Sequence, residues 1–454
     1  MVGVGGAGMS GLARILNDLG CQVTGSDVKK SDTTERLEKS GIRTFQGHSS
    51  AYVDHDTDLV VRSTAIPDSN PEVKKAVRIG VPVIKRGQML AMLFNRKQGI
   101  AVSGAHGKTT TTSMIAVMLE ENGYDPSFMI GGELKNTNIG AKLGQGDYFV
   151  AEADESDASF LLLNPLASVV TNVEDDHLDF YHSLENLKAA FHQFTGQVKP
   201  GGFSVLYHGD PFLRGMKKDY KHLIYYGLNP EADYYADDIV KQGWGASFTV
   251  YRRGESMGRI NLTIPGQHNI LNALAAVALG TELGLDFHGI RQSLHRFQGA
   301  KRRFQVIGQV DGITILDDYA HHPTEVEATI EAVRQFHDHR LIVVFQPHRY
   351  SRTRQMGEQF GPAFRSSDLL IVTDVYGAGE EPIADVTGEI VYQAAIENGC
   401  NAIYESDSEK ILAYLQGETR TGDFVMFMGA GDIWKLGERA KEVLTAYHSL
   451  SSGS

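Results

Sequence analysis

Cysteine is scarce in this sequence of 454 residues, and long apolar runs are missing. Only Cys21 and Cys400 occur, which excludes a framework of disulfide bonds and favours a reducing compartment. No stretch reaches the roughly 18 consecutive apolar residues that a membrane-spanning helix requires. The first residues, MVGVGGAGMSG, lack the basic and apolar segments of a secretory signal. We therefore expect a soluble, cytoplasmic protein that does not associate with a membrane.

Basic residues are too few for a surface that binds nucleic acid without sequence preference. The chain has 43 Lys and Arg residues against 56 Asp and Glu residues, a formal net charge of −13, and such binding depends on a basic surface. A local basic pocket for a phosphorylated small molecule is still compatible with this balance. Proline is low at 13, whereas glycine is high at 49, which indicates many tight turns where the backbone approaches a ligand.

Three segments repeat one pattern, in which a short apolar run, a glycine-rich turn and an amphipathic helix follow each other. This alternation predicts parallel sheets covered by helices, an α/β fold. We expect a Rossmann-like domain at residues 1–97, a central P-loop-type ATPase domain at 98–301 and a C-terminal Rossmann-like α/β domain at 302–454. The central domain should combine a parallel sheet with a small antiparallel sheet, because residues 202–263 alternate between polar and apolar side chains. The predicted strands lie at residues 2–4, 22–27, 59–62, 81–84, 100–103, 148–151, 168–171, 312–316, 341–345, 369–372 and 424–427.

The strongest local signal is the sequence GAHGKTT between a predicted strand and a predicted helix. Small residues let backbone N–H groups turn toward a phosphate, Lys108 supplies a charge for the β- and γ-phosphate oxygens, and Thr109 supplies a hydroxyl for Mg²⁺. The loop is shortened, because Val102 stands where the first glycine of the common P-loop is expected. The alternative is a solvated glycine-rich turn. The predicted phosphate-binding residues are Gly104, Ala105, His106, Gly107, Lys108, Thr109 and Thr110.

Two acidic stretches follow further predicted strands. EADESD occupies residues 152–157, and TNVEDDHLD occupies residues 171–179. Ligands of open α/β sheets bind outside the carboxyl ends of the strands, and carboxylates there can hold a hard cation. An acid of EADESD is therefore the predicted Mg²⁺ partner of the P-loop, and Asp176 and His177 could reach a second metal ion or a phosphate. The alternatives are a solvated acidic turn and a histidine that makes only structural hydrogen bonds.

The N-terminal glycines approach the dinucleotide-binding pattern G-x-G-x-x-G. Gly3, Gly5 and Gly8 match its spacing, and Asp27 follows about 20 residues later. The pattern predicts a pyrophosphate at a helix N-terminus, but it leaves a nicotinamide cofactor, a UDP-sugar and a purely structural turn open. The predicted substrate-binding residues of this segment are Gly5, Gly6, Ala7, Gly8, Met9, Ser10, Asp27 and Ser63.

Two polar stretches follow strands of the C-terminal segment. DDYAHHPTE occupies residues 317–325, and QPHRYSRTR occupies residues 346–354. The three arginines of the second stretch can clamp a carboxylate or a phosphate in a bidentate manner, unless they begin a solvated helix. GAGD at residues 429–432 closes another strand, and it can line the same cleft or form a tight structural turn.

In this order, the motifs resemble the Mur ligases of peptidoglycan synthesis. The resemblance extends over nearly the whole chain and includes GAHGKTTTT, EADESD, TNVEDDHLD, PGQHNILNA and DDYAHHPTE. It implies three domains that bind a UDP-sugar, ATP and an amino acid, with ATP and Mg²⁺ as cofactors. QPHRYSRTR is similar to the stretch in family members that add L-alanine to UDP-N-acetylmuramate, whereas members that recycle a tripeptide differ there. The implied partners are therefore UDP-N-acetylmuramate and L-alanine, with no nucleic acid.

The resemblance also implies a role for single residues. Those implied at the ATP phosphates and Mg²⁺ are Lys108, Thr109, Glu152 and His177. Those implied at the adenine, the hinge and the ribose are His268, Asn269, Arg303 and Asp318. Those implied at L-alanine and the reacting carboxyl group are His321, Arg349 and Arg352, with His321 as a candidate base. The chain departs from the family at one point, since several members carry a carbamylated lysine where this sequence has His192 and its nearest lysine is Lys188.

The implied reaction is ATP-driven amide formation through an acyl phosphate. A tripeptide-recycling ligase is the alternative within the same class. A nicotinamide-dependent oxidoreductase is the alternative from another class, but it leaves the GKT loop and the acidic strand ends without a function. A regulatory ATPase that changes shape on nucleotide binding is a third possibility. Both a monomer and a homodimer are compatible with the sequence.

Overall fold

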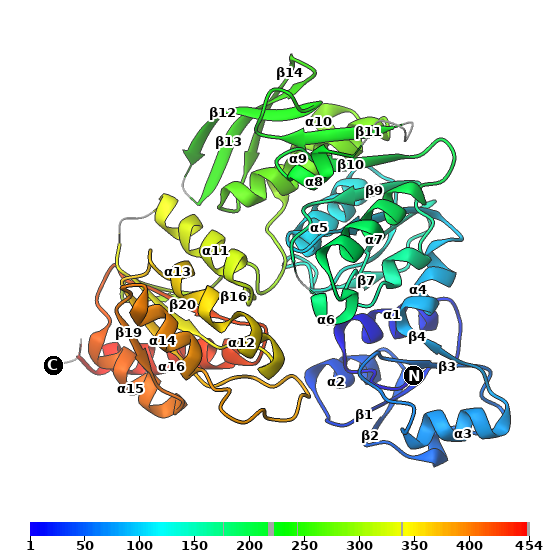
Figure 1. Cartoon of the computed structure of the whole chain (residues 1–454), viewed down its shortest axis with the longest axis horizontal. Coiled ribbons are helices and arrows are strands. Elements are labelled where there is room, and N and C mark those ends of the chain that lie inside the picture. The colour runs from blue at the N-terminus through cyan, green and yellow to red at the C-terminus, as the bar shows by residue number, and fades with distance from the viewer. Residues whose placement is uncertain (176, 217–221, 243, 337–338, 452–454) are drawn as a thin grey trace. The chain divides into compact units, whose positions relative to one another are not determined.

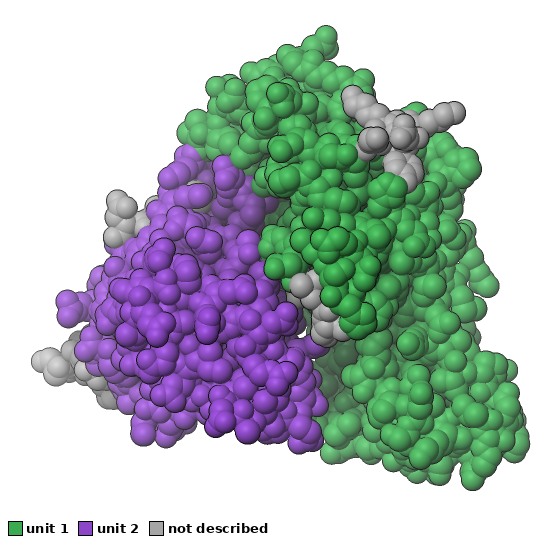
Figure 2. All heavy atoms as spheres, viewed as in Figure 1, with its two compact units in different colours: residues 1–240, 247–262, 269–300 green, residues 241–246, 263–268, 301–454 purple. Residues whose placement is uncertain are grey.

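The computed structural model describes residues 1–175, 177–216, 222–242, 244–336 and 339–451. The chain divides into two compact units, which Figure 2 shows in different colours. Unit 1 comprises Met1–Val240, Ser247–Leu262 and Asn269–Ala300, and unit 2 comprises Lys241–Ala246, Thr263–His268 and Lys301–Ser454. Both units are built from sheets covered by helices, which confirms the predicted α/β class. The division into domains at residues 1–97, 98–301 and 302–454 stays a prediction.

The first part of unit 1 is a parallel sheet with four short strands and one bridging residue. Val2 pairs with Ser26 on one side and with Arg62 on the other. The predicted strand at residues 2–4 is therefore only one residue long, because Gly3 has a φ of 80°, which an extended strand does not allow. The strands are β1 (Thr24–Asp27), β2 (Arg43–Gln46), β3 (Val60–Arg62) and β4 (Val83–Lys85). The helices are α1 (Ala7–Asp18), α2 (Asp32–Lys39), η1 (Ser50–Tyr52), α3 (Pro71–Ile79) and α4 (Arg86–Phe94).

The rest of unit 1 is built on one sheet of ten strands (Figure 1). Its order is β14-β13-β12-β11-β10-β9-β5-β8-β6-β7, and β5 lies between β9 and β8 as their parallel neighbour. The strands are β5 (Gln98–Ser103), β6 (Ser127–Met129), β7 (Ala141–Lys142), β8 (Tyr148–Glu152), β9 (Ala167–Val170), β10 (Phe203–Tyr207), β11 (Leu223–Gly227), β12 (Tyr234–Gln242), β13 (Gly245–Arg252) and β14 (Glu255–Leu262).

Residues 202–263 do not form a sheet of their own. Strands β10 and β11 extend the central sheet in parallel pairing. The antiparallel portion follows further out, where only Arg253 and Gly254 connect β13 to β14, a link short enough only for antiparallel neighbours. Both linking residues have positive φ, 50° and 89°, as the tight hairpin turn requires. The alternation in the sequence thus predicts the strands but not their continuity with the parallel sheet.

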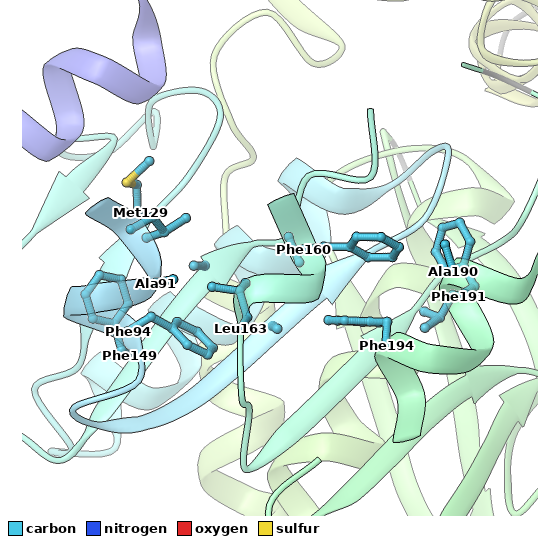
Figure 3. Packing of buried hydrophobic residues seen from close by; sticks show 14 of the residues in the cluster. Ala91, Phe94, Met129, Phe149, Phe160, Leu163, Ala190, Phe191 and Phe194 are labelled. Atoms are coloured by element: carbon cyan, nitrogen blue, oxygen red, sulfur yellow. The ribbon is translucent and has the colours of Figure 1, made fainter. Parts of the chain in front are cut away.

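Helices cover both faces of this sheet. They are α5 (Lys108–Glu121), η2 (Ser159–Leu162), α6 (Leu178–Tyr181), α7 (Leu184–Gly196), α8 (Pro211–Arg214), α9 (Gln267–Glu282) and α10 (Phe287–Arg296). Figure 3 shows the aromatic part of the core, where the ring of Phe160 lies 5.3 Å from Phe191 and 4.9 Å from Phe194 between ring centroids. Phe94 packs on Phe149 at 5.7 Å. These side chains belong to one hydrophobic cluster, which joins α4, β8, η2 and α7.

Unit 2 contains a sheet of six strands in the order β15-β16-β20-β17-β18-β19. Only β15 and β16 are antiparallel, and the other neighbours are parallel. The strands are β15 (Gln305–Val310), β16 (Ile313–Asp318), β17 (Leu341–Phe345), β18 (Leu369–Val372), β19 (Ala402–Tyr404) and β20 (Phe424–Met428). The helices are α11 (Pro323–Phe336), α12 (Tyr350–Met356), η3 (Gly357–Gln359), α13 (Phe360–Ala363), α14 (Glu389–Glu397), α15 (Ser408–Glu418) and α16 (Ile433–Ser451). The carboxyl ends of β16, β20 and β17 therefore lie side by side at one edge.

Among the described helices, none combines the length and the apolar character needed to cross a membrane.

Candidate nucleotide and substrate sites

The loop at residues 104–107 connects β5 to α5 and can be formed only with glycine at two positions. Gly104 has a φ of 133° and Gly107 a φ of 82°, which side chains rarely adopt. A Cβ atom on Gly104 would lie 2.2 Å from Thr171 Oγ1, and one on Gly107 would lie 2.6 Å from Asn272 Oδ1. The loop is thus packed closely against the segment after β9 and against α9.

Asn172, which the sequence did not single out, holds this loop in place. Its side-chain oxygen accepts a hydrogen bond of 2.8 Å from the backbone N–H of His106, and its carbonyl accepts one of 3.3 Å from Ala105. The hydroxyl of Thr171 donates to the carbonyl of His106 over 2.5 Å. The N-cap residue of α5 is Gly107, which has no side chain that could cap the helix. The first N–H groups of a helix have no intrahelical acceptor, so this end can bind an anion.

Lys108 is the first residue of α5 and folds back over the loop. Its ammonium group donates to the carbonyl of Gly104 at 2.5 Å, to that of Ala105 at 3.4 Å, and to Glu155 Oε1 at 2.5 Å. Burial lowers the pKa of Lys108, but the negative charges of Glu155 and its neighbours raise it above its ordinary value. The lysine is therefore a permanent cation at the helix terminus.

Glu155 is the second glutamate of EADESD and the one that meets the P-loop lysine. Its side chain is only 3% exposed, and Ser103 Oγ lies 3.5 Å from its second carboxylate oxygen. The Nε2 atom of His177 lies 3.8 Å from Glu155 Oε1, so the structure brings His177 to the same cluster. Asp176, its predicted companion, lies outside the described residues. The sequence analysis selected Glu152 in this motif. The structure distinguishes the two acids by their burial, since Glu155 is buried whereas Glu152 is half-buried.

Glu152 and Thr109 each lie close to the turn of Gly131 and Gly132. Glu152 lies beside Val102 in the register of β8 and β5, and its Oε1 atom accepts a hydrogen bond of 2.6 Å from the N–H of Gly131. A Cβ atom on Gly132 would lie 3.5 Å from Thr109 Cγ2. The hydroxyl of a threonine and the carboxylate oxygens of a glutamate are ligands that suit Mg²⁺. The predicted metal ligands thus fit the ion by their chemistry.

Thr110 is buried within α5. Two hydrogen bonds connect the next residue of this helix to Asn269 through the side chain of Asn272. The hydroxyl of Thr111 donates to Asn272 Oδ1 at 3.1 Å, and Asn272 Nδ2 donates to Asn269 Oδ1 at 3.2 Å. The predicted adenine residue Asn269 is therefore connected to the P-loop helix. His268, its neighbour in sequence, belongs to unit 2.

The N-terminal glycine loop leads into α1 in a similar way. Gly6 is the N-cap residue of this helix and has no side chain that could cap it. The N–H of Gly5 donates to Asp27 Oδ2 at 2.8 Å, so the carboxylate of Asp27 supports the loop. A Cβ atom on Gly8 would lie 3.1 Å from Arg86 Cδ, so Arg86 lies against this helix terminus. Its guanidinium donates to Asp154 Oδ2 at 2.7 Å.

Three other predicted residues of this segment have mainly structural contacts. Met9 is 1% exposed and belongs to the hydrophobic core. The hydroxyl of Ser10 donates to the carbonyl of Ala7 at 3.0 Å, and the N–H of Ser63 donates to the carbonyl of Val2 at 3.0 Å. Ser10 and Ala7 also border a cavity.

This cavity has a volume of about 270 Å³ and lies between α1, α2 and the segment before β7. Arg14 and Arg36 border it, together with Glu133, which forms an ion pair with Arg36. Arginine side chains suit a phosphate or a carboxylate. The cavity therefore continues from the helix terminus of α1 toward two basic groups.

In unit 2, Asp318 supports the backbone instead of facing outward. Its carboxylate accepts hydrogen bonds of 2.7 Å from the N–H of Phe304 and 2.8 Å from that of Ala320. Arg303, which also stands near this turn, lies 3.5 Å from Glu325 Oε1 and 5.2 Å above the ring of Tyr319. These contacts fix the DDYAHHPTE loop after β16.

His321 is held in that loop as a neutral imidazole. Its Nδ1 atom lies 3.0 Å from the carbonyl of Tyr319 and 3.2 Å from Glu325 Oε2, so Nδ1 is the donor and Nε2 keeps its lone pair. Burial lowers the pKa of His321 to about 4, although Glu325 opposes the shift. The ring of His348 lies 5.6 Å away, and burial lowers its pKa to about 3.

Arg349 and Arg352 follow β17 at the start of α12. Arg349 is exposed and has a φ of 69°, and its N–H donates to the carbonyl of Tyr376 at 2.8 Å. Arg352 is half-buried one turn further along the helix. The GAGD turn lies beside them, since Gln346 Nε2 donates to Asp432 Oδ1 at 3.1 Å. The structure thus brings both polar loops of unit 2 and the GAGD turn together.

The chain matches three domains of one family in the order of the sequence. Residues 1–98 match the Mur ligase family catalytic domain, residues 102–280 the Mur ligase middle domain, and residues 302–431 the Mur ligase glutamate ligase domain. The chain belongs to the Mur ligase family. Its members are ATP-dependent ligases, and this chain is an enzyme of that class.

Two similar Mur ligases have sequences that correspond to this one over nearly their full length. The UDP-N-acetylmuramate–L-alanine ligase of Syntrophomonas wolfei is 52% identical over 448 residues, which are 98% of this chain and 96% of the relative. The enzyme of the same name from Desulforamulus reducens is 49% identical over 440 residues, 96% of this chain and 95% of the relative.

Solved structures of Mur ligases show the same fold. The UDP-N-acetylmuramate–alanine ligase from Thermotoga maritima superimposes with a TM-score of 0.85 at 28% identity and covers 99% of this chain and 98% of its own. A murein peptide ligase from Psychrobacter arcticus gives a TM-score of 0.73 at 26% identity, with 98% of each chain covered. In this Mur ligase, the residues that sequence reasoning missed are Asn172, Glu155 and Arg86.

Proposed function

We propose that this Mur ligase joins L-alanine to UDP-N-acetylmuramate and converts ATP to ADP and phosphate in the process. The 52% identity over almost the whole chain with a UDP-N-acetylmuramate–L-alanine ligase carries the proposal. The stretch at residues 346–354 supports L-alanine as the amine over a tripeptide, since this stretch resembles that of the L-alanine-adding members. A tripeptide-recycling ligase, the type of enzyme solved from Psychrobacter arcticus, is the second candidate.

The three parts of the chain take one ligand each in this proposal. Residues 1–97 bind the UDP-sugar, with its pyrophosphate at the N-terminus of α1 and near Arg86, which lies against Gly8. Residues 98–301 bind ATP at the N-terminus of α5, and residues 302–454 bind the amino acid. A cytoplasmic location and a monomeric or dimeric state stay predictions.

Lys108 and the uncapped helix terminus bind the ATP phosphates. Thr109, Glu152 and His177 would hold Mg²⁺, which when bound neutralises charge on the phosphoryl group that is transferred. Asn172 keeps the loop in the shape that directs the N–H groups of α5 toward the phosphates. The loop and lysine of this chain therefore position the γ-phosphate and reduce its charge repulsion with the incoming carboxylate.

In the first step, a carboxylate oxygen of the muramate attacks the γ-phosphorus of ATP, and the bond to the β-phosphate oxygen breaks. The products are an acyl phosphate and ADP. In the second step, the amine of L-alanine attacks the acyl carbon, and the bond to the phosphate oxygen breaks. The amine loses a proton, which Nε2 of the neutral His321 can accept. Arg349 and Arg352 orient the carboxylate of L-alanine, because a guanidinium binds a carboxylate with two parallel hydrogen bonds.

The test is the release of ADP by the purified full chain with UDP-N-acetylmuramate, Mg²⁺ and a panel of amino acids. L-alanine should give the highest rate, and the tripeptide L-alanyl-γ-D-glutamyl-meso-diaminopimelate should give little. Faster turnover with the tripeptide would favour the second candidate. Binding of NADH with no release of ADP under any condition would favour an oxidoreductase and would contradict the proposal.

A further inference from the structure

All three hydrogens of the Lys108 ammonium group point to acceptors of the protein. An ammonium group has three donors, and those of Lys108 are directed to the carbonyl oxygens of Gly104 and Ala105 and to Glu155 Oε1, at 2.5, 3.4 and 2.5 Å. The lysine therefore has no donor left for a phosphate in this rotamer. A phosphate oxygen can receive a hydrogen from Lys108 only if one of these acceptors is given up.

Among these acceptors, Glu155 is the one whose charge offsets the positive charge of Lys108. Its carboxylate lies against the ammonium group inside the protein, with 3% exposure of the glutamate side chain and 20% of the lysine side chain. The two opposite charges cancel at short range, so the pair presents little net positive charge to a phosphate. The carbonyls of Gly104 and Ala105 carry no formal charge and belong to the loop itself.

The backbone of Glu155 is fixed, so the carboxylate cannot follow the lysine far. Tyr181 donates its hydroxyl hydrogen to the carbonyl of Glu155 at 2.6 Å, and the N–H of Ala158 donates to the same carbonyl at 3.1 Å. Lys108 is at the end of a long side chain and can move to another acceptor. When the hydrogen bond between Lys108 and Glu155 is broken, the lysine is therefore the side chain that moves.

The neighbouring acids of the same turn have other partners. Asp154 accepts from Arg86 at 2.7 Å, and Asp157 accepts from the N–H of Ser159 at 3.0 Å. Glu155 is therefore the one acid of the described part of this turn that accepts a hydrogen bond from Lys108. A buried ion pair adds little to fold stability compared with apolar packing, so stability alone gives no strong reason for an acid at this place.

We propose that Glu155 is a positioning residue that holds Lys108 back on the loop, and that the nucleotide phosphates bind only when they take Lys108 from this carboxylate. The inference rests on the proposed nucleotide site. Glu155 lowers the affinity for the nucleotide and makes the approach of Lys108 depend on the presence of the phosphate.

The test measures the dissociation constants of ATP and ADP by isothermal titration calorimetry in EDTA, which excludes effects on metal binding. Glu155→Gln keeps the size of the side chain and removes its charge, and it should tighten ATP binding about tenfold. The matched control Asp157→Asn removes a charge from the same turn without affecting Lys108, and it should leave the constant within about twofold.

A double-mutant cycle with Lys108→Met shows whether Glu155 acts through the lysine. In the Lys108→Met background, Glu155→Gln should no longer tighten ATP binding. An equal gain with and without Lys108 would mean that Glu155 merely repels the phosphates, and it would overturn the proposal. No gain in the presence of Lys108 would overturn it as well.

Two further measurements keep the outcome interpretable. Glu155→Asp keeps the charge but shortens the reach, and it should give an intermediate gain even if the glutamine variant does not fold; an unchanged constant would contradict the proposal. If the unaltered protein binds neither nucleotide, the nucleotide site itself is wrong. If it binds both and Glu155→Gln changes nothing, only the role of Glu155 is wrong.

Discussion

Unit 1 contains two glycine-rich loops, each of which leads from a strand or bridge into a helix whose N-cap residue is a glycine. The loop before α1 is supported by Asp27, and Arg86 of another helix lies against Gly8 at the start of α1. The loop before α5 is supported by Asn172 and carries its own cation, Lys108. The loop before α1 suits a pyrophosphate that stays bound, whereas the loop before α5 suits a phosphate whose charge changes during transfer.

The largest expected effect is the loss of the cation that distinguishes the two loops. Lys108→Ala should lower the rate of ligation by about 10²–10³-fold or more, because the charge on the transferred phosphoryl group is no longer offset. Binding of UDP-N-acetylmuramate should be largely kept, since the loop before α1 is untouched. Steady-state rates of ADP release and titration with the UDP-sugar measure both effects. Turnover near that of the unaltered enzyme would refute the P-loop assignment.

Substitution of one glycine by alanine in each of the two loops should further distinguish their roles in nucleotide binding. On Gly104, a Cβ atom would meet Thr171 Oγ1 at 2.2 Å with a φ of 133°, whereas on Gly6 its nearest contact would be the carbonyl of Gly3 at 3.7 Å. Gly104→Ala should destabilise the loop by about 1–3 kcal/mol and weaken ADP binding. Gly6→Ala should keep the melting temperature and ADP binding. Similar ADP affinity in both variants would show that the loop before α5 does not carry the nucleotide.

A smaller and more selective effect is expected at the exposed arginine of unit 2. Arg349→Ala should raise the KM for L-alanine about tenfold, since a charge-assisted contact with its carboxylate is lost. The KM for ATP should change little, because the nucleotide belongs to the loops of unit 1. Initial rates at varied L-alanine and ATP give both constants. A shift confined to ATP would reassign this loop to nucleotide binding.

The smallest effect at neutral pH concerns His321, which is kept neutral whereas Lys108 is kept charged. Burial lowers the pKa of His321 to about 4, against about 6.5 for an unfolded chain. Between these values the unfolded state binds more protons than the folded state, so this group makes stability rise with pH and fall as pH drops from about 6.5 to about 4. The imidazole should stay neutral at pH 6. An NMR titration of the histidine ring protons measures the midpoint, and a value near 6.5 would contradict the burial of this group.

The sequence predicts features that depend on neighbouring residues and misses those that depend on distant ones. The strands at residues 341–345 and 369–372 have the predicted bounds, because buried parallel strands are continuous apolar runs. By contrast, Asn172 meets a loop 66 positions away, and such a pairing depends on which strands become neighbours.

The acidic turn shows the same limit at the level of single side chains. EADESD predicts an acidic turn after a strand, but its pattern does not tell which of its acids is buried. Glu155 is buried because the turn after β8 directs it toward Ser103 and Lys108. Arg86 was missed because its partner, Asp154, is 68 residues away, and no local pattern connects them.

Asp154 and Glu155 are consecutive residues, yet one is paired with the arginine beside the first glycine loop and the other with the lysine of the second. A single peptide unit thus sets the spacing between the two cations. Insertion or deletion of one residue here would misplace both partners at once, so this turn should tolerate no change in length, unlike ordinary surface loops.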